Sequence, residues 1–386
     1  MNFKKKVSEM LVSKPEAIFL LNLLFDPLDI KRHSQQYKKR RRSDLIKQSY
    51  GRKAKIRYVP PSFHIYITFR CNLRCSYCQW LLQDKDAFDN APTMSVLDFN
   101  RILDKFGKDI GTIALQGGEP TAHPEFSEIV TSAKSKNFRL KMSTNGTLIK
   151  ERINDLKSID DLNISLNGLD YESFERTTNG TRKQFDKMMS GIDLLNAQKI
   201  PFTLSYVLFE ENLSKVQEVI QFAKQVKPTF LNFSPGNAHG SSSLTSLVSS
   251  SPAVKHFLAE FISKDDFPFS IHLPLILNPG SETFKKEICQ YPWNKVYISP
   301  TGDISYCCHL PFNPEIGNIF KGYHFNSQGI INFRKSMIAH HLSEDCLFCH
   351  RRFRDNSAAT FDSTHRKWIL PPDLSDDKIS KEGKNL

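Results

Sequence analysis

The chain has 386 residues, of which 39% are hydrophobic, 24% charged and 11% aromatic, which is typical of a folded globular protein and excludes a largely disordered or fibrous one. This length suits one large domain with a smaller one, or two to three ordinary domains. The formal net charge is +12, but residues 1–60 hold 16 lysines and arginines against 5 aspartates and glutamates, so the other 326 residues carry only +1.

The basic N-terminal extension, residues 1–60, contains an apolar segment at Ile18–Phe25 that predicts a short amphipathic helix. A bilayer span needs roughly 20 apolar residues, and no small-residue cleavage site follows, so we expect a cytoplasmic protein without a membrane span. The basic run Lys38–Arg42 could contact phosphates, an acidic peptide or an anionic membrane, or be a solvated extension. No nucleic-acid-binding fold accompanies it.

From residue 61 to about 240 the chain alternates between two patterns. Short β-rich runs occur at residues 63–69, 112–115, 139–143, 161–166, 202–208 and 229–233. Helical periodicity occurs at residues 95–106, 125–135, 184–198 and 213–226, and a shorter helix is expected near Leu148. Repeated βα units predict a parallel sheet, curved or closed, with the chemistry where strands end in loops.

The rest of the chain has a different character. Residues 241–284 contain a serine-rich run at 241–252 and are typical of a linker. Residues 285–370 form a small cysteine-rich α+β segment, in which a hairpin is expected from Val296 to Tyr306 around the turn at Gly302. Residues 371–386 are a polar tail.

A first group of cysteines, Cys71, Cys75 and Cys78, follows the first predicted strand. Three thiolates from one short loop suit a four-iron cubane and leave one iron without a protein ligand. The alternative, part of a zinc site, would need a fourth ligand, and His64 lies too far back in the preceding strand. Without a signal peptide, such clusters indicate metal binding in a reducing compartment.

A second group consists of Cys289, Cys307, Cys346 and Cys349. A hairpin would bring the first two thiolates together at its base, and the C-x2-C pair would close a four-thiolate site. Spacing alone does not separate zinc from iron–sulfur there. Cys308 could replace Cys307 as a ligand.

Between about residues 61 and 233 the chain resembles the radical S-adenosylmethionine (SAM) superfamily. The resemblance rests on the three-cysteine loop and on the segments Gln116–Pro120, Ser143–Gly146 and Ser165–Gly168, which follow the second, third and fourth predicted strands. It implies a partial (β/α)6 TIM-like barrel that holds a [4Fe-4S] cluster and SAM. Reduction then yields a 5′-deoxyadenosyl radical, which abstracts a hydrogen from a substrate.

The resemblance also implies SAM contacts. Tyr77 and Leu208 would lie beside the adenine, and Gly117, Gly118 and Glu119 would hold the methionine amino group. Ser143 and Asn145 lie in the segment where the family places its ribose contacts, and Ser165 and Asn167 would supply the remaining contacts. The arginine expected for the methionine carboxylate aligns with Thr178, so Arg176 or Arg182 would substitute. As single residues, Ser143 and Asn167 could equally cap turns, and Leu208 could be core.

The C-terminal segment, including Gly302 and Gly317-Asn318, resembles the SPASM domain or its shortened form, the twitch domain. This implies one auxiliary [4Fe-4S] cluster on Cys289, Cys307, Cys346 and Cys349, serving electron transfer or structure. The Gly302 spacing favours Cys307 over Cys308, which would be a buried small hydrophobe.

Three functions follow as hypotheses. The first is an oxidoreductase that dehydrogenates a sugar or aminocyclitol carbinol, with the auxiliary cluster taking an electron from the substrate and a flavodoxin or ferredoxin as donor. The second is a maturase of a ribosomally made peptide. The third, a non-enzymatic zinc and nucleic-acid-binding protein, is opposed by the SAM motifs. No residue stands out as the catalytic base.

Overall fold

The computed structural model describes residues 46–78, 90–236, 267–274, 288–308, 310, 312–322, 325–342, 346, 358–362 and 367–369. The apolar segment and basic run of the N-terminal extension, the serine-rich run and Cys349 lie outside these ranges. Within them, no helix combines the length and the apolar character that a bilayer crossing requires.

The described strands form one eleven-stranded sheet in the order β11-β10-β7-β6-β5-β4-β3-β2-β1-β8-β9. Strands β1 to β7 pair in parallel in chain order, and β8 adds in parallel to β1, whereas β9, β10 and β11 pair antiparallel. The strands are β1 Ser62–Thr68, β2 Thr112–Gly117, β3 Arg139–Thr144, β4 Asp161–Leu166, β5 Thr203–Leu208, β6 Phe230–Pro235, β7 Ser270–Pro274, β8 Lys295–Ile298, β9 Ile304–Ser305, β10 Ala358–Asp362 and β11 Lys367–Ile369.

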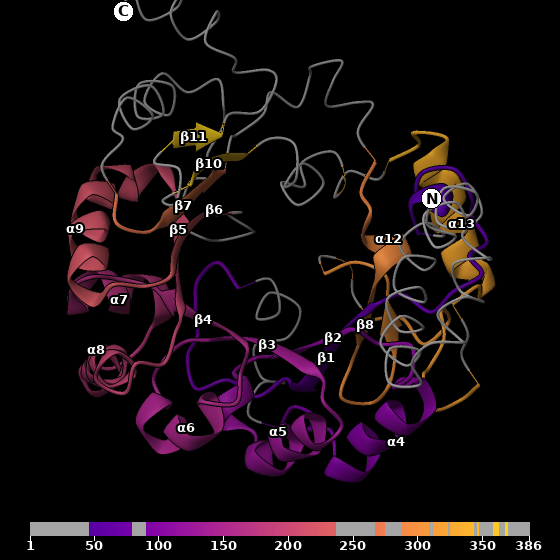
Figure 1. The fold of residues 1–386 in the computed structure, drawn as a ribbon, viewed down its shortest axis with the longest axis horizontal. Coiled ribbons are helices and arrows are strands. Elements are labelled where there is room, and N and C mark those ends of the chain that lie inside the picture. The colour runs from indigo at the N-terminus through magenta and orange to yellow at the C-terminus, as the bar shows by residue number, and fades with distance from the viewer. Residues whose placement is uncertain are drawn as a thin grey trace, which may run out of the picture.

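Helices cover the outer side of this sheet, which curves into an arc from β10 and β11 through β4 to β8 (Figure 1). The helices are α4 Val96–Phe106, α5 Phe126–Ser135, α6 Ile149–Leu156, α7 Tyr171–Thr178, α8 Arg182–Ala197, α9 Val216–Val226, α12 Tyr291–Asn294 and α13 Gln328–Ile338, with 3-10 turns η1 Pro120–Ala122 and η2 Glu210–Lys215. The parallel sheet predicted from the repeated βα units is confirmed, and so is the partial (β/α)6 barrel that the family resemblance implies.

Alternation along the strands separates two faces of the sheet. In β3, Leu140 and Met142 are buried, whereas Arg139, Lys141 and Ser143 are exposed. The buried set joins the continuous hydrophobic core, which includes the apolar faces of the helices. Because side chains alternate between the two faces of a strand, the polar set faces the inner, concave side, which we call the lumen.

All six predicted strands of the barrel are present, and so are the predicted helices and the hairpin, in which Tyr297 of β8 pairs with Ser305 of β9. Helix α7 was missed because it is short and buries only Phe174 and Thr178. Helices α12 and α13 and strands β7, β10 and β11 were also missed, since cysteine-rich or linker composition dominated their segments.

Residues 46–60 of the N-terminal extension dock on the C-terminal part of the chain. The indole Nε1 of Trp293 donates to the Lys53 carbonyl (2.8 Å), and the Ile56 amide donates to Asn326 Oδ1 (2.8 Å). Since β8 pairs with β1, the cysteine-rich segment extends the barrel sheet itself. The division into a core at 61–240, a linker at 241–284 and an auxiliary domain at 285–370 stays a prediction.

Candidate functional site

The first cysteine group lies in the loop Cys71–Cys78, here called the cysteine loop, directly after β1. The tip of β2 supports its start, because the amides of Gly118 and Glu119 donate to the carbonyls of Thr68 and Arg70 (3.0 and 2.8 Å). A Cβ on Gly118 would stand 2.5 Å from the Arg70 oxygen, and one on Gly117 would stand 2.2 Å from the Thr68 oxygen. These glycines therefore allow the strand tip to pack against the chain that leads into Cys71.

The C-terminal end of α7 holds the middle of the cysteine loop. The amides of Arg74 and Ser76 donate to the carbonyls of Thr178 and Thr177 (both 2.9 Å). In return, Asn179 Nδ2 donates to the Arg74 carbonyl (2.8 Å). The last carbonyls of a helix have no partner within the helix, so the loop uses acceptors that the helix end leaves free.

The three cysteines are partly buried, and their thiols are close enough to influence one another. Burial, followed by the charge of Glu119, raises the pKa of Cys71 to about 12. Burial and the charges of Cys71 and Cys78 raise the pKa of Cys75 well above its usual value. Such thiols stay protonated unless a positively charged centre binds them as thiolates.

The described cysteines do not form a site for a single metal ion. Among the described residues, no three histidine, cysteine or acidic side chains converge on one metal ion. A zinc ion draws its ligands around one point, whereas an iron–sulfur cubane places each thiolate on a separate iron. None of the seven described cysteines is in a disulfide.

Glu119, from the Gly-Gly-Glu segment, is only 1% exposed and accepts hydrogen bonds at both carboxylate oxygens. Its Oε1 accepts from the amide and hydroxyl of Thr121 (3.1 and 2.6 Å) and from the Thr144 hydroxyl (2.7 Å). Its Oε2 accepts from the Asn145 amide (2.7 Å). Burial raises the pKa of Glu119, while these hydrogen bonds act in the opposite direction. The carboxylate thus ties the end of β2 to the end of β3.

Tyr77 links the cysteine loop to the end of β4. Its hydroxyl donates to Asn167 Oδ1 (2.5 Å), and its ring lies 5.5 Å from the Phe209 ring. Burial and then the charges of Cys75 and Cys78 raise the pKa of Tyr77 well above its usual value. Two residues from separate predicted motifs, Tyr77 and Asn167, are therefore in direct contact.

The other residues predicted to contact SAM lie in three different places: beside the cysteine loop, on the lumen face of the sheet, and in the hydrophobic core. Asn145 is 9% exposed, and its side chain bonds to Asn72 in the cysteine loop. Ser143 faces the lumen and accepts from Asn163 (3.1 Å), and Ser165 shares that face of the sheet. Leu208 is 1% exposed and belongs to the hydrophobic core.

The two candidate arginines lie on the outer surface of the barrel. Arg176 is exposed, and its charge acts on Tyr206, Asp170 and Lys215. Arg182 is exposed and pairs with Asp186 (3.2 Å). The positive charge that acts on the Cys71 thiol comes from Arg74, within the cysteine loop.

A ladder of uncharged polar groups crosses the lumen face of β3 to β6. Asn163 Nδ2 donates to the Ser143 hydroxyl, and the Ser205 hydroxyl donates to Asn163 Oδ1 (3.1 and 2.7 Å). Asn232 Nδ2 continues the ladder to Ser205 and Ser234 (3.1 and 3.0 Å). The Asn232 Oδ1 atom is buried, and no group in the described part of the chain donates a hydrogen bond to it.

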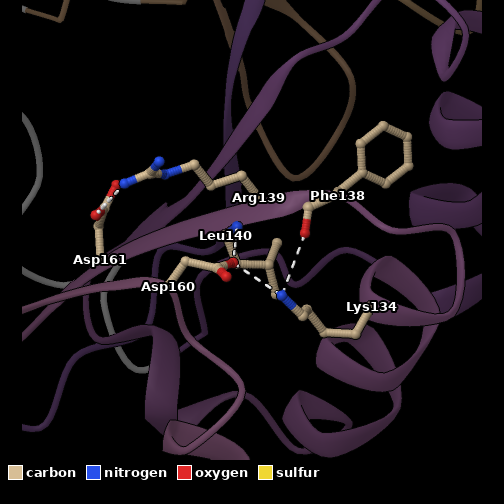
Figure 2. A network of polar contacts seen from close by, with 6 residues as sticks. All are labelled: Lys134, Phe138, Arg139, Leu140, Asp160 and Asp161. Carbon is tan, nitrogen blue, oxygen red and sulfur yellow. Dashed lines mark hydrogen bonds and ion pairs between the residues drawn. The ribbon is translucent and has the colours of Figure 1, made fainter. Parts of the chain in front are cut away.

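Charged side chains lie at the start of β3 and β4, where the strands enter the sheet. Figure 2 shows Arg139 paired with Asp161 and, nearby, Asp160 accepting from Lys134 Nζ and the Leu140 amide (2.9 and 2.8 Å). Hydrogen bonds from Arg139 hold the pKa of Asp161 below its usual value. These charged groups therefore lie nearer the amino-terminal ends of the strands than the ladder of uncharged polar groups does.

The opposite side of the lumen, along β1 and β8, is aromatic. Buried Tyr66, Tyr291 and Tyr297 form a small cluster against which Phe69 and Phe312 pack. The His64 ring lies 4.7 Å from the Tyr297 ring. We call this surface the aromatic wall.

In the second cysteine group, Cys307 and Cys346 lie beside one side chain, Tyr306. Burial and then the charges of these two cysteines raise the pKa of Tyr306, and its ring stacks on Phe333 of α13 at 4.1 Å. Cys289 packs against both the main core and the aromatic wall, whereas Cys308 packs against the aromatic wall. Cys349 lies outside the described residues.

Sequence reasoning missed several residues that build this site, namely Asn72, Thr147, Asn163, Thr177, Asn179, Gln184 and Phe209. Asn72 lies within the three-cysteine motif and Thr147 directly follows the Ser143–Gly146 segment, so their positions were a signal for these two. For the others, the contacts depend on how α7, α8 and β5 pack, which no local pattern reveals.

Comparison with known proteins gives a family for the barrel. Residues 65–223 match the model of the radical SAM superfamily. A "Probable GTP 3',8-cyclase" of Methanocella arvoryzae is 30% identical over 184 residues, 47% of this chain and 56% of that protein. The "Antilisterial bacteriocin subtilosin biosynthesis protein AlbA" of Bacillus subtilis is 26% identical over 273 residues, 69% of this chain and 58% of that protein.

The chain thus spans about half the length of the curated relatives that it matches. Among solved structures, Streptococcus suis SuiB bound to precursor peptide SuiA superposes with a TM-score of 0.58 at 15% sequence identity, over 86% of this chain and 77% of that one. At this identity the match shows a shared fold.

Proposed function

Residues 65–223 match the radical SAM superfamily, and from that premise we propose that the protein cleaves SAM reductively and uses the resulting radical to take a hydrogen from a peptide substrate. The observation that supports the chemistry most directly is the partly buried cysteine loop. It is held at the carboxyl edge of the sheet by hydrogen bonds to the ends of α7, β3 and β4.

Cys71, Cys75 and Cys78 would bind a [4Fe-4S] cluster with one open iron. When bound, the cluster and SAM supply one-electron chemistry that the side chains cannot provide. The protein contributes burial, which excludes water from the thiolates, and the ring of Tyr77 beside them. Gly117, Gly118, Ser143, Ser165 and Asn167 stay proposed SAM contacts along the same edge.

Cys289, Cys307, Cys346 and Cys349 would hold the auxiliary cluster and so provide an electron acceptor for a net oxidation. Cys307 and Cys346 both lie near Tyr306, whereas Cys308 packs against the aromatic wall, and this difference supports Cys307 over Cys308 as the ligand. A flavodoxin or ferredoxin in the cytoplasm is the proposed donor for the first cluster.

Two observations support a peptide substrate. The similarity to the bacteriocin biosynthesis protein extends over 69% of this chain, whereas the cyclase similarity extends over 47%. The lumen presents uncharged amides and hydroxyls on β3 to β6 opposite the aromatic wall. Such a lining suits backbone amides and an apolar side chain together. Oxidation of a sugar or aminocyclitol carbinol stays a prediction that no contact favours.

The test is reductive SAM cleavage by anaerobically reconstituted protein. We expect about seven to eight irons per chain and release of 5′-deoxyadenosine under strong reduction. Replacing Cys71, Cys75 and Cys78 together by alanine should abolish release, whereas the matched variant Cys308→Ala should retain it. Release from the triple variant, or colourless wild-type protein that binds zinc, would overturn the proposal.

The substrate class needs its own measurement. A short peptide encoded beside the gene should lose two hydrogens per modified residue when incubated with enzyme, SAM and reductant, as mass spectrometry would detect. If deuterium from carbinol-labelled sugars enters 5′-deoxyadenosine instead, the substrate is a carbinol.

A further inference from the structure

A closed ring of hydrogen bonds joins the cysteine loop to the end of β3. Asn145 Nδ2 donates to Asn72 Oδ1 (2.8 Å), Asn72 Nδ2 donates to the Thr147 hydroxyl (2.7 Å), and that hydroxyl donates to Asn145 Oδ1 (2.7 Å). Asn145 is 9% and Thr147 1% exposed. Asn72 directly follows Cys71 in the chain.

One backbone group determines the direction of every bond in this ring. The Thr147 amide can only donate, and it points to Asn145 Oδ1 (3.0 Å). The Asn145 side chain must therefore turn its Nδ2 toward Asn72, whose own oxygen must accept and whose Nδ2 then faces the Thr147 hydroxyl. Flipping either amide would place two donors or two acceptors against each other.

The ring leaves Asn145 little capacity for a ligand. Its oxygen already accepts two hydrogen bonds from Thr147, and its nitrogen already donates one to Asn72. Its backbone amide is engaged by Glu119 Oε2 (2.7 Å). Only one N–H of the side chain is uncommitted in these contacts.

The ring acts at the Cys71 end of the cysteine loop. Gln184 Nε2 of α8 also donates there, to the Asn72 carbonyl (2.7 Å), and the described contacts of α7 with the loop begin at Arg74. The side chain of Asn72 therefore links the Cys71 end of the loop to the end of β3. Losing either amide would leave buried polar atoms without partners, which is costly.

We infer that Asn145 is a positioning residue for the cysteine loop, acting through Asn72, and not a residue that binds the ribose of SAM. The inference rests on the proposed function in taking the cysteine loop as a cluster site. It changes the role that the family resemblance implies for Asn145 and assigns a role to Asn72.

The test is a double-mutant cycle with Asn72→Ala, Asn145→Ala and the double variant. After anaerobic reconstitution, we measure the rate of iron loss to a chelator, the electron paramagnetic resonance spectrum of the reduced protein without SAM, and the Kd for SAM. Asn163→Ala, which removes another amide that bridges two strands, is the control for the cluster measurements.

We expect each single variant to lose iron about fivefold faster or more, as for the loss of a buried hydrogen bond, and to change the SAM-free spectrum. Because the two side chains act as one unit, the double variant should be no worse than the worse single variant. A normal iron-loss rate and spectrum in Asn145→Ala combined with a tenfold or greater rise in the Kd for SAM would overturn the inference. The inference would also be overturned if the effects of the two single substitutions added up in the double variant.

Thermal unfolding of the four cluster-free proteins separates this inference from the proposed function. If wild-type protein takes up no cluster, the proposed function fails. The hydrogen-bond ring still predicts that, in the cluster-free proteins, the stability losses of the two single variants do not add in the double variant. If they do add, Asn72 and Asn145 do not act as one unit.

Discussion

Glu119 shows how one buried carboxylate can organise the ends of two strands. Its oxygens accept from Thr121, Thr144 and the Asn145 amide, so η1 and the end of β3 are both oriented by it. The Gly-Gly-Glu segment was predicted from its position after the second strand. The prediction assigned its side chain to a ligand, whereas the described contacts of the carboxylate are with the protein.

Glu119→Gln tests this role. The glutamine keeps the volume but replaces one acceptor oxygen by an NH2 group, so at least one buried donor loses its acceptor. We expect the free energy of unfolding of the cluster-free protein to fall by about 1–3 kcal/mol in denaturant titrations. The exposed Glu128→Gln is the matched control. Equal effects of the two substitutions would contradict the role.

The same carboxylate predicts a pH dependence. Burial raises the pKa of Glu119 above its ordinary value of 4.5, so the folded protein binds this proton more tightly than the unfolded chain. Such a group contributes stability at low pH that is lost as the pH rises through the folded-state pKa. The stability difference between wild type and Glu119→Gln should therefore narrow as the pH rises above 4.5. A difference independent of pH would refute this assignment.

Short connecting structures, more than the long helices, hold the cysteine loop. Helix α7 has eight residues, yet its last carbonyls bind the loop, and its capping box at Asp170 sets where it begins. At the tip of β2, Gly118 packs directly against the backbone of residues 69–70, which is possible only because it has no side chain.

Gly118→Ala should disturb this packing. The added Cβ would lie 2.5–2.6 Å from the carbonyl oxygens of Arg70 and Phe69, and these backbone atoms cannot move without moving the cysteine loop. We expect a loss of about 1–3 kcal/mol in stability, with faster iron loss after reconstitution. Gly111→Ala, whose Cβ would meet its nearest atom at 3.6 Å, is the control. Unchanged iron retention in Gly118→Ala would show that the tip does not shape the loop.

Residues 46–60 contact α12, α13 and the segment before α13, next to the β8 edge of the barrel. Arg334 of α13 is 1% exposed and donates to the carbonyls of Ala54, Pro292 and Phe325 (3.1, 2.9 and 2.9 Å). It thereby connects the N-terminal extension, α12 and the segment before α13. Because β8 pairs with β1, this assembly continues the sheet that carries the cysteine loop.

Arg334→Met should loosen this junction. Three buried carbonyls would lose a donor, so we expect a stability loss of at least about 2 kcal/mol. Trypsin should then cleave faster at the exposed Lys53 and Arg57, as mass spectrometry of timed digests would show. Lys335→Met, at the adjacent exposed position, is the control. Equal cleavage rates in both variants would mean that Arg334 does not hold the extension.

Local patterns were sufficient for the barrel and for the first metal-binding loop. The alternation of Leu140 and Met142 with polar neighbours, like the apolar spacing of the helices, depends only on nearby residues and on water. The cysteine spacing likewise lies within eight residues, and so the loop could be identified without knowing what surrounds it.

The partners of those residues depend on tertiary structure. Asn145 meets Asn72, 73 positions away, and Tyr77 meets Asn167, 90 positions away, because parallel strands end at one edge. The docking of residues 46–60 on α12 and α13 has the same origin. A hydrogen-bond donor in the sequence has no preferred acceptor until packing excludes water and leaves one within reach, which is why roles inside the site followed from the fold alone.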